Sequence, residues 1–576
     1  MSTWSVPHNF IHSTHELDVK ADPTMASITS LAKKTLRRQV TPIMLLTVIT
    51  AALSSTMYGY NMSKLNTPYE ILLSFINTTY TERNGVEPAP TFLTLIWSVI
   101  ISAFVGAGAL GSFSSGVFAE KFGRRRGLFI NHLLAFASAA AEMAAYYCKV
   151  YELLIVGRAI IGFNSGISQG LVSLYIAEVS PKQVRGAFLS FHQIGIVIGI
   201  LLGQVLSLEF VLGGVNTWPF LCGFSVMPCL LSCCLLPLCP ESPRYLLSVR
   251  KDEAAAKAAL LRLTRSKHAA KELLNEIREE EKVVSSRPDL YESFQYRDLF
   301  TRPELRRSLM MSALLNVSQQ WSGINAIFAY SHSVFYNAGV DPEAIQYAII
   351  GTGVINVVVT FISLALIEKV GRRKLLLIPN WILVGSLLVL TACINQQSNF
   401  AWLNYFTICI MLAYIVGFGL GFGPLTSMIT CETFEQQARP QAMAVIQTVH
   451  YVSCFVLMLT FKFMEAAMKE FIFMLFACIV AVATTYLMFY LPESAHRSVK
   501  EVVADIKDGW RWRPCNGSDG AESEGAEIAR KRRKRGSSGT YIKRADARPE
   551  DLQLQAAVTT PLRKADYDAD DDLEEA

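Results

Sequence analysis

Apolar runs of about twenty residues recur along most of this chain, separated by short polar stretches. A helix of that length crosses roughly 30 Å of hydrocarbon, so each run predicts a membrane-spanning helix. The predicted spans are residues 42–60, 92–112, 127–147, 152–175, 187–208, 217–237, 308–336, 346–367, 374–394, 402–428, 441–461 and 470–491. The pattern predicts an all-α membrane protein with twelve transmembrane helices.

A charged stretch from about residue 240 to 305 divides the spans into two sets of six. Its charges alternate at helical spacing, which predicts short solvated helices. We therefore expect a cytoplasmic N-terminal segment, a six-helix bundle, a cytoplasmic helical domain, a second six-helix bundle and a cytoplasmic tail. These parts cover residues 1–41, 42–239, 240–307, 308–491 and 492–576. The tail is densely charged and poor in aromatics, which predicts disorder over most of it.

Composition agrees with a membrane protein: 51% of the 576 residues are hydrophobic and 18% are charged, against about a quarter charged in soluble domains. The net charge of +5 is small and dispersed, so no nucleic-acid partner is predicted. Most of the 12 cysteines lie in apolar spans without zinc-site spacing, so we expect no metal and no cofactor. The sequence contains no nucleophile–base arrangement that would indicate an enzyme. It also contains no ATP-binding loop that would indicate a pump.

The positions of Lys and Arg in the loops predict the orientation of the chain in the membrane. These residues concentrate in the loops after spans two, four, six, eight and ten and are missing from those after spans five, seven and nine. The positive-inside rule then places both termini in the cytoplasm. The outward loop of residues 61–91 contains the sequon Asn77-Thr78-Thr79, a predicted N-glycosylation site. We expect a multi-pass protein of the plasma membrane, in contact with lipid; the oligomeric state stays open.

The two halves repeat a charged pattern at the cytoplasmic ends of corresponding helices. A fold of two similar halves can use acidic–basic pairs there to latch the cytoplasmic side shut. The alternative interpretation is that these are ordinary interfacial charges. It is the weaker one, because four pairs occur at corresponding positions. The candidate gate residues are Glu120, Arg124, Arg125, Glu178, Arg185, Glu368, Arg372, Arg373, Glu432 and Arg439.

Four motifs resemble the sugar-porter branch of the major facilitator superfamily: GxxxEKxGRR, IVGRAIIGFNSG, PESPRYLL and SQQWSGINA. Within that branch the chain looks like an animal facilitative glucose/fructose transporter, over residues 45–495. The resemblance implies a major facilitator fold with alternating access to a site at the membrane midplane. It adds Glu241, Arg244 and Glu493 to the gate, although the closing motif departs from the family at Ser494 and Ala495.

Neutral polar side chains inside the apolar spans are the candidates for solute contact, because amides and hydroxyls bind a hexose without a buried charge. The candidates that match sugar-contacting positions of the family are Gln193, Gln319, Gln320, Asn325 and Asn356. Tyr58 is a weaker candidate. Hydrogen bonding between helices is the alternative role. Gly323 and the glycine-rich residues 417–424 further predict that spans seven and ten break.

Proton coupling is not expected, because Asn61 stands where proton-driven relatives carry an aspartate. Glu142 lies within span three, and we expect it to extend toward the membrane surface. The resemblance therefore favours passive uniport of a hexose such as glucose or fructose.

Two departures from the family pattern bear on which sugar is carried. Ser427 and His450 replace a tryptophan and an asparagine of glucose-preferring members, which slightly favours the fructose-type branch. Open alternatives are a carrier of urate, a polyol or dehydroascorbate, and a non-transporting sugar sensor.

Overall fold

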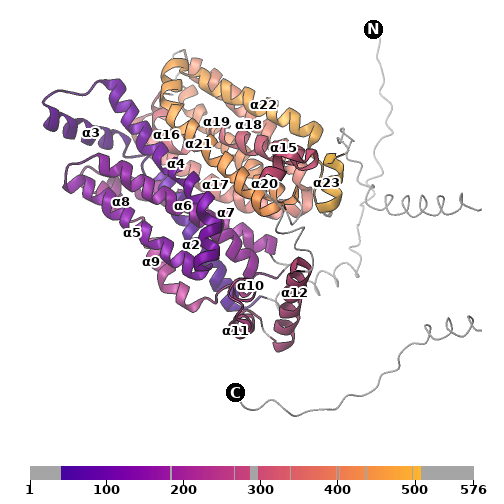
Figure 1. Ribbon diagram of the computed structural model, residues 1–576. Helices are drawn as coiled ribbons and strands as arrows, with labels where there is room; N and C mark the ends of the chain where they lie inside the picture. Colours follow the sequence, from indigo (N-terminus) through magenta and orange to yellow (C-terminus); the bar gives the residue numbers. More distant parts are fainter. Residues whose placement is uncertain are drawn as a thin grey trace, which may run out of the picture. The chain divides into compact units, whose positions relative to one another are not determined.

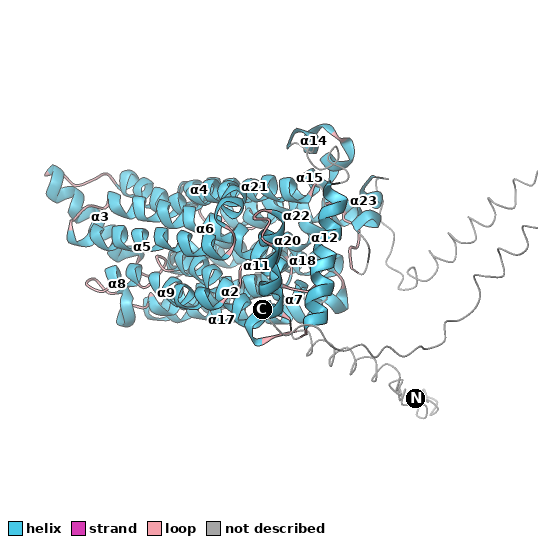
Figure 2. Cartoon of the chain, turned by 60° about the horizontal axis from the view of Figure 1, so that its bottom comes forward, coloured by secondary structure: helices cyan, strands magenta, loops and turns pink. Residues whose placement is uncertain are grey.

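A computed structural model describes residues 40–507 except 182–184, 265, 286–295, 338, 397–398, 401, 435–437, 496 and 498. The chain divides into one compact unit, Met1–Trp512, and a second, Arg513–Ala576, which lies outside the described residues. All regular secondary structure in the described part is helical (Figure 2). Most of the N-terminal segment and of the tail, including the predicted disorder, lies outside the described residues.

The first half of the chain forms a set of long helices with one extra helix, α3, at one end (Figure 1). Its elements are α2 (Pro42–Ser63), α3 (Tyr69–Asn84), α4 (Pro90–Phe122), α5 (Arg125–Tyr147), α6 (Glu152–Val179), α7 (Arg185–Leu206), η1 (Glu209–Gly213), α8 (Trp218–Gly223), α9 (Val226–Leu235) and η2 (Leu236–Leu238). Helix α3 occupies the predicted outward loop, with Asn77 on it and Thr79 of the sequon buried.

The charged middle stretch and the second half follow. Their elements are α10 (Pro243–Ser248), α11 (Glu253–Leu263), α12 (Lys267–Ser285), α14 (Tyr296–Thr301), α15 (Pro303–Gln320), α16 (Ile324–Asn337), α17 (Pro342–Val370), α18 (Arg372–Gln396), α19 (Leu403–Leu420), α20 (Phe422–Glu432), α21 (Arg439–Met468), α22 (Phe471–Tyr490) and α23 (Val499–Lys507).

Eleven helices among the described residues are long and apolar enough to cross a membrane. The remaining predicted span, residues 308–336, is divided into α15 and α16 by residues 321–323. Gly323 has φ of +89°, a left-handed conformation that other residues adopt only at a cost. The span predicted at 402–428 is likewise divided, into α19 and α20 at Gly421. The prediction that spans seven and ten break is confirmed.

The two sets of helices pack against each other along α4 with α21 and α7 with α17. On the first of these lines, aromatic rings of α21 lie over glycines of α4. A Cβ atom built on Gly106 would lie 2.8 Å from the Phe455 ring, and one on Gly108 would lie 2.7 Å from the Tyr451 ring. Glycine therefore allows the close approach that brings polar groups from both halves together.

The charged middle stretch forms short helices, as predicted. Helices α10, α11 and α12 share a small apolar core of Leu247, Ala256, Leu260, Leu274 and Ile277, among others. They are joined to the first half at the start of α2, where the Thr41 hydroxyl donates a 3.0 Å hydrogen bond to the Leu263 carbonyl.

Candidate functional site

The break between α15 and α16 brings predicted contact residues of the second half together. The Asn325 amide donates to Gln320 Oε1 over 2.5 Å, and Gln320 Nε2 lies 3.0 and 3.1 Å from the two ring nitrogens of His450 on α21. Asn325 also contacts Cys454 Sγ at 3.2 Å. Because a neutral imidazole has one acceptor nitrogen and one N–H, accepting from Gln320 leaves His450 a donor for another group.

A second polar group lies in the first half. His192 on α7 has its Nδ1 2.6 Å from Ser55 Oγ on α2 and its Nε2 3.1 Å from Gln169 Oε1 on α6. Tyr58 lies one turn beyond Ser55, and its ring stacks on Phe104 at 5.6 Å between centroids. These residues face the second half, since Tyr58 and Gln169 both neighbour Tyr451 of α21.

The other predicted contact residues have different surroundings. Gln193 forms no hydrogen bond with any described residue and points toward Gly423 of α20, with its Nε2 3.9 Å from a Cβ built there. Asn356 is buried against Gly419, whereas Ser427 is exposed on α20. Gln319 donates to the Phe422 carbonyl at the start of α20 over 2.9 Å. Gln319 therefore joins the broken ends of two helices.

The site offers neutral donors and acceptors from both halves: amides, imidazoles, hydroxyls and a thiol. Such groups suit a polyhydroxylated, uncharged solute, which they can bind and release without separating buried charges. No group of three His, Cys, Asp or Glu among the described residues could hold a metal ion.

A buried ion pair joins α2 and α5 within the first half. Lys64 Nζ at the end of α2 contacts Glu142 Oε2 of α5 at 2.5 Å, and both side chains are 1% exposed. The expectation that Glu142 extends to the membrane surface is therefore wrong: the ammonium of Lys64 neutralises the carboxylate inside the first half. Nearby, Arg158 donates to the Asn61 carbonyl over 2.6 Å, and its guanidinium lies 4.6 Å from the Phe104 ring.

The predicted gate residues of the first half are arranged around two carboxylates. Glu178 pairs with Arg124 at 2.7 Å and accepts a hydrogen bond from Ser242. Glu241 accepts from the backbone N–H groups of Arg124 and Arg125, both over 2.9 Å, at the start of α5. A carboxylate is favourable there because the N-terminus of a helix carries partial positive charge.

The second half repeats this arrangement. Glu493 accepts from the backbone N–H groups of Arg372 at 2.9 Å and Arg373 at 3.2 Å, at the start of α18. Arg372 lies 3.5 Å from Glu432, the counterpart of Glu178. The glycine before each helix, Gly371 here and its equivalent in the first half, has a φ of +88° or +84°. The predicted internal repeat is thus visible in equivalent contacts.

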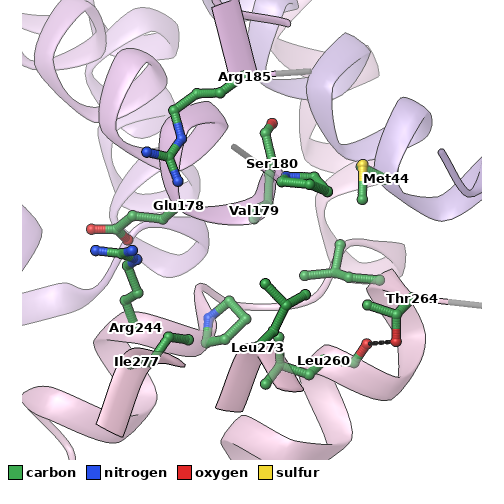
Figure 3. Close-up of a pocket in the computed structure, with 13 residues that line it drawn as sticks. Met44, Glu178, Val179, Ser180, Arg185, Arg244, Leu260, Thr264, Leu273 and Ile277 are labelled. Atoms are coloured by element: carbon green, nitrogen blue, oxygen red, sulfur yellow. Dashed lines mark hydrogen bonds between the residues drawn. The ribbon is translucent and has the colours of Figure 1, made fainter. Parts of the chain in front are cut away.

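Arg185 and Arg244 extend toward Glu178 in a small pocket between the first half and helices α10 to α12 (Figure 3). Glu120 is exposed and forms no ion pair with a described residue. Arg439 donates to the Phe434 carbonyl. The side chain of Glu368, although its backbone is in α17, lies outside the described residues.

At the end of the helices away from the predicted gate, the two halves also touch. Asn66 Oδ1 accepts a 3.2 Å hydrogen bond from the backbone N–H of His332 on α16. Lys462 of α21 lies 5.1 Å from the centre of the Tyr69 ring and pairs with Glu465 at 2.9 Å. Burial raises the pKa of Tyr69 to about 12, so its phenol stays neutral at physiological pH. The ends of the two halves away from the predicted gate are therefore in contact in this structure.

Sequence reasoning missed several polar residues of the site: Ser55, Gln169, Tyr451 and Cys454 as contacts, and Lys64 as the partner of Glu142. Gln169 could have been identified as a candidate from the sequence, because it is an amide inside an apolar span. Lys64 was placed beyond the end of span one, where a lysine is ordinary.

Comparison with known proteins agrees with this geometry. Residues 47–505 match the family model described as "Sugar (and other) transporter". The chain is 36% identical over 465 residues to the sheep (Ovis aries) solute carrier family 2, facilitated glucose transporter member 3, with 81% of this chain and 93% of that protein covered. It is 35% identical over 465 residues to the bovine (Bos taurus) facilitated glucose transporter member 5, with 81% and 92% covered.

A solved structure shows the same fold. The partially occluded inward open conformation of the xylose transporter XylE from E. coli aligns with a TM-score of 0.66 at 21% identity, covering 79% of this chain and 99% of that one. The all-helical membrane fold predicted from the hydrophobic pattern and the major facilitator architecture implied by the resemblance are confirmed at the level of the fold.

Proposed function

Since this chain belongs to the sugar-transporter family, we propose that it carries a hexose such as glucose or fructose across the membrane by facilitated transport. The observation that carries the proposal is the cluster of neutral amides and imidazoles contributed by both halves at the helix breaks. A hexose presents hydroxyls that donate and accept, and this cluster supplies partners of both kinds. No covalent chemistry is involved.

Transport proceeds by alternating access. The outward contacts Asn66–His332 and Tyr69–Lys462 close one side while the cytoplasmic latches reorganise on the other. The break between α15 and α16 lets α16 move away from the first half without unfolding α15. Gln320 and Asn325 lie on either side of that break, so sugar binding and gate movement are coupled through them.

The transport is passive. Asn61 cannot titrate, and its side-chain N–H donates to the Met57 carbonyl. Glu142 is the carboxylate at membrane depth in the first half, and Lys64 holds it as a neutral pair. A carrier with this arrangement lets sugar flow down its gradient in either direction.

Several finer assignments complete the proposal. Both termini lie in the cytoplasm and the protein resides in the plasma membrane, in contact with lipid. Asn77, in the middle of α3, is glycosylated. Gln193, Asn356, Tyr58 and Ser427 contribute to the sugar site, and His450 favours fructose over glucose.

The test is uptake of labelled glucose, fructose, urate, inositol and dehydroascorbate by cells deficient in hexose uptake, with and without a protonophore. We expect uptake of at least one hexose, unaffected by the protonophore. No hexose uptake despite surface expression refutes the proposal. Uptake of only urate, inositol or dehydroascorbate would instead support a carrier of another solute.

A further inference from the structure

Tyr451 of α21 has an unusual environment. It is 2% exposed, its ring lies against Gly108 of the other half, and the proton of its buried hydroxyl has no acceptor among the described residues. A buried hydroxyl proton without an acceptor is costly, so such a group in a native protein calls for an acceptor that arrives from outside.

The polar groups around this hydroxyl belong to both halves. The side chain of Gln169 lies beside it, as do Tyr58 and Cys454, while the ring of His450 meets the Tyr451 ring edge-on at 5.7 Å. Tyr451 therefore lies where the polar group of the first half meets that of the second.

The donor and the acceptor can be assigned in each hydrogen bond that His192 forms in the first half. An amide oxygen only accepts, so with Gln169 Oε1 3.1 Å from His192 Nε2, that nitrogen must carry the proton. Nδ1 of the neutral imidazole is then the acceptor, and it receives the Ser55 hydroxyl proton over 2.6 Å. Gln169 keeps its two amide hydrogens, and its side chain lies beside the oxygen of Tyr451.

From this geometry we infer that Gln169 and Tyr451 form a sugar-contacting pair across the two halves, in which the Tyr451 hydroxyl donates to one hydroxyl oxygen of the sugar and thereby selects the sugar. Gln169 donates to the Tyr451 oxygen, which orients the phenol proton away from Gln169 and toward the solute. The inference rests on the proposed function and names a specificity determinant of the same site.

The test combines Tyr451→Phe with a set of monodeoxy and monofluoro analogues of the transported hexose, measured as inhibition constants for uptake. In the natural protein, the deoxy analogue at one ring position should bind about tenfold more weakly than the parent sugar, because a hydrogen bond is lost. The inhibition constant of the fluoro analogue at that position should lie between those of the parent sugar and the deoxy analogue, since fluorine is a weak acceptor. In Tyr451→Phe the parent should weaken about tenfold, and the same deoxy analogue should show no further loss.

Tyr60→Phe is the matched control, because this buried hydroxyl already donates to the Leu221 carbonyl over 2.6 Å. It should leave the pattern of analogue preferences unchanged. Gln169→Leu provides a second variant if Tyr451→Phe does not reach the surface. It should reduce the difference in inhibition constant between the parent sugar and the deoxy analogue at the same ring position. The differences at the other ring positions should stay unchanged.

A uniform loss for the parent and all analogues in Tyr451→Phe, or unchanged constants, would overturn the inference and leave Tyr451 a packing residue. Absence of hexose uptake by the natural protein would instead refute the proposed function, so the two failures are distinguishable.

Discussion

The buried pair of Lys64 and Glu142 allows a quantitative prediction. Glu142→Gln and Lys64→Met each leave one uncompensated group in a site where both side chains are 1% exposed. Breaking a buried ion pair in this way costs about 3–5 kcal/mol, whereas replacing both partners by apolar residues is about neutral. The double variant Lys64→Met/Glu142→Met should therefore be much more stable than either single variant.

Space at the site favours methionine in the double variant. A Cβ built on Gly157 would lie 2.5 Å from Glu142 Cγ, so the stem at position 142 has no room for branching. A loss of about 3 kcal/mol shifts the folded-to-unfolded equilibrium roughly a hundredfold. It should appear as a marked drop in the half-life of the monodisperse protein in detergent at a fixed temperature.

Arg83→Met is the matched control for this experiment. Arg83 pairs with Glu152 at 2.6 Å, but the two side chains are 43% and 44% exposed, so solvent screens the pair and no measurable loss is expected. If the double variant is as short-lived as the worse single variant, or if both single variants match the natural protein, the buried pair does not have the role assigned to it.

Three other predictions follow from the site and its gates. Gln320→Ala should lower hexose uptake at least tenfold with unchanged surface expression, because Gln320 links Asn325 to His450; near-normal uptake removes it from the site. Tyr69→Cys/Lys462→Cys joined by a bifunctional methanethiosulfonate crosslinker should block uptake until the link is reduced, and uptake that persists with the crosslink formed contradicts the contact between the two halves. Glu493→Gln should lower the maximal rate more than the apparent affinity, because its carboxylate caps α18 at the cytoplasmic gate; a pure affinity change in sugar titrations argues against that role.

Hydrophobic periodicity predicted the helices well because lipid requires every spanning segment to satisfy its own backbone. The breaks at Gly323 and Gly421 followed from glycine content alone. Helix α3 was missed because it is short and polar, so no long apolar run marks it.

The site was predicted less completely than the fold. Gln320, Asn325 and His450 are polar residues in apolar spans, and they come together as such residues are expected to. Which amides share a site depends on how each helix is rotated about its axis. A single sequence does not specify that rotation. Glu142 was misplaced because its partner Lys64 is distant in the sequence, so a surface position was the expected one. Tyr451 was missed, and its contact with Gly108 shows that it lies at the boundary between the two halves.

The central claim is that both halves close in turn around one hexose site, and counterflow tests it most directly. Purified protein in liposomes is loaded with unlabelled hexose and diluted into a trace of labelled hexose without any ion gradient. The account predicts that label transiently accumulates inside above its external concentration and then declines as the unlabelled sugar leaves. Reconstituted protein that binds the hexose but gives no such overshoot would contradict it.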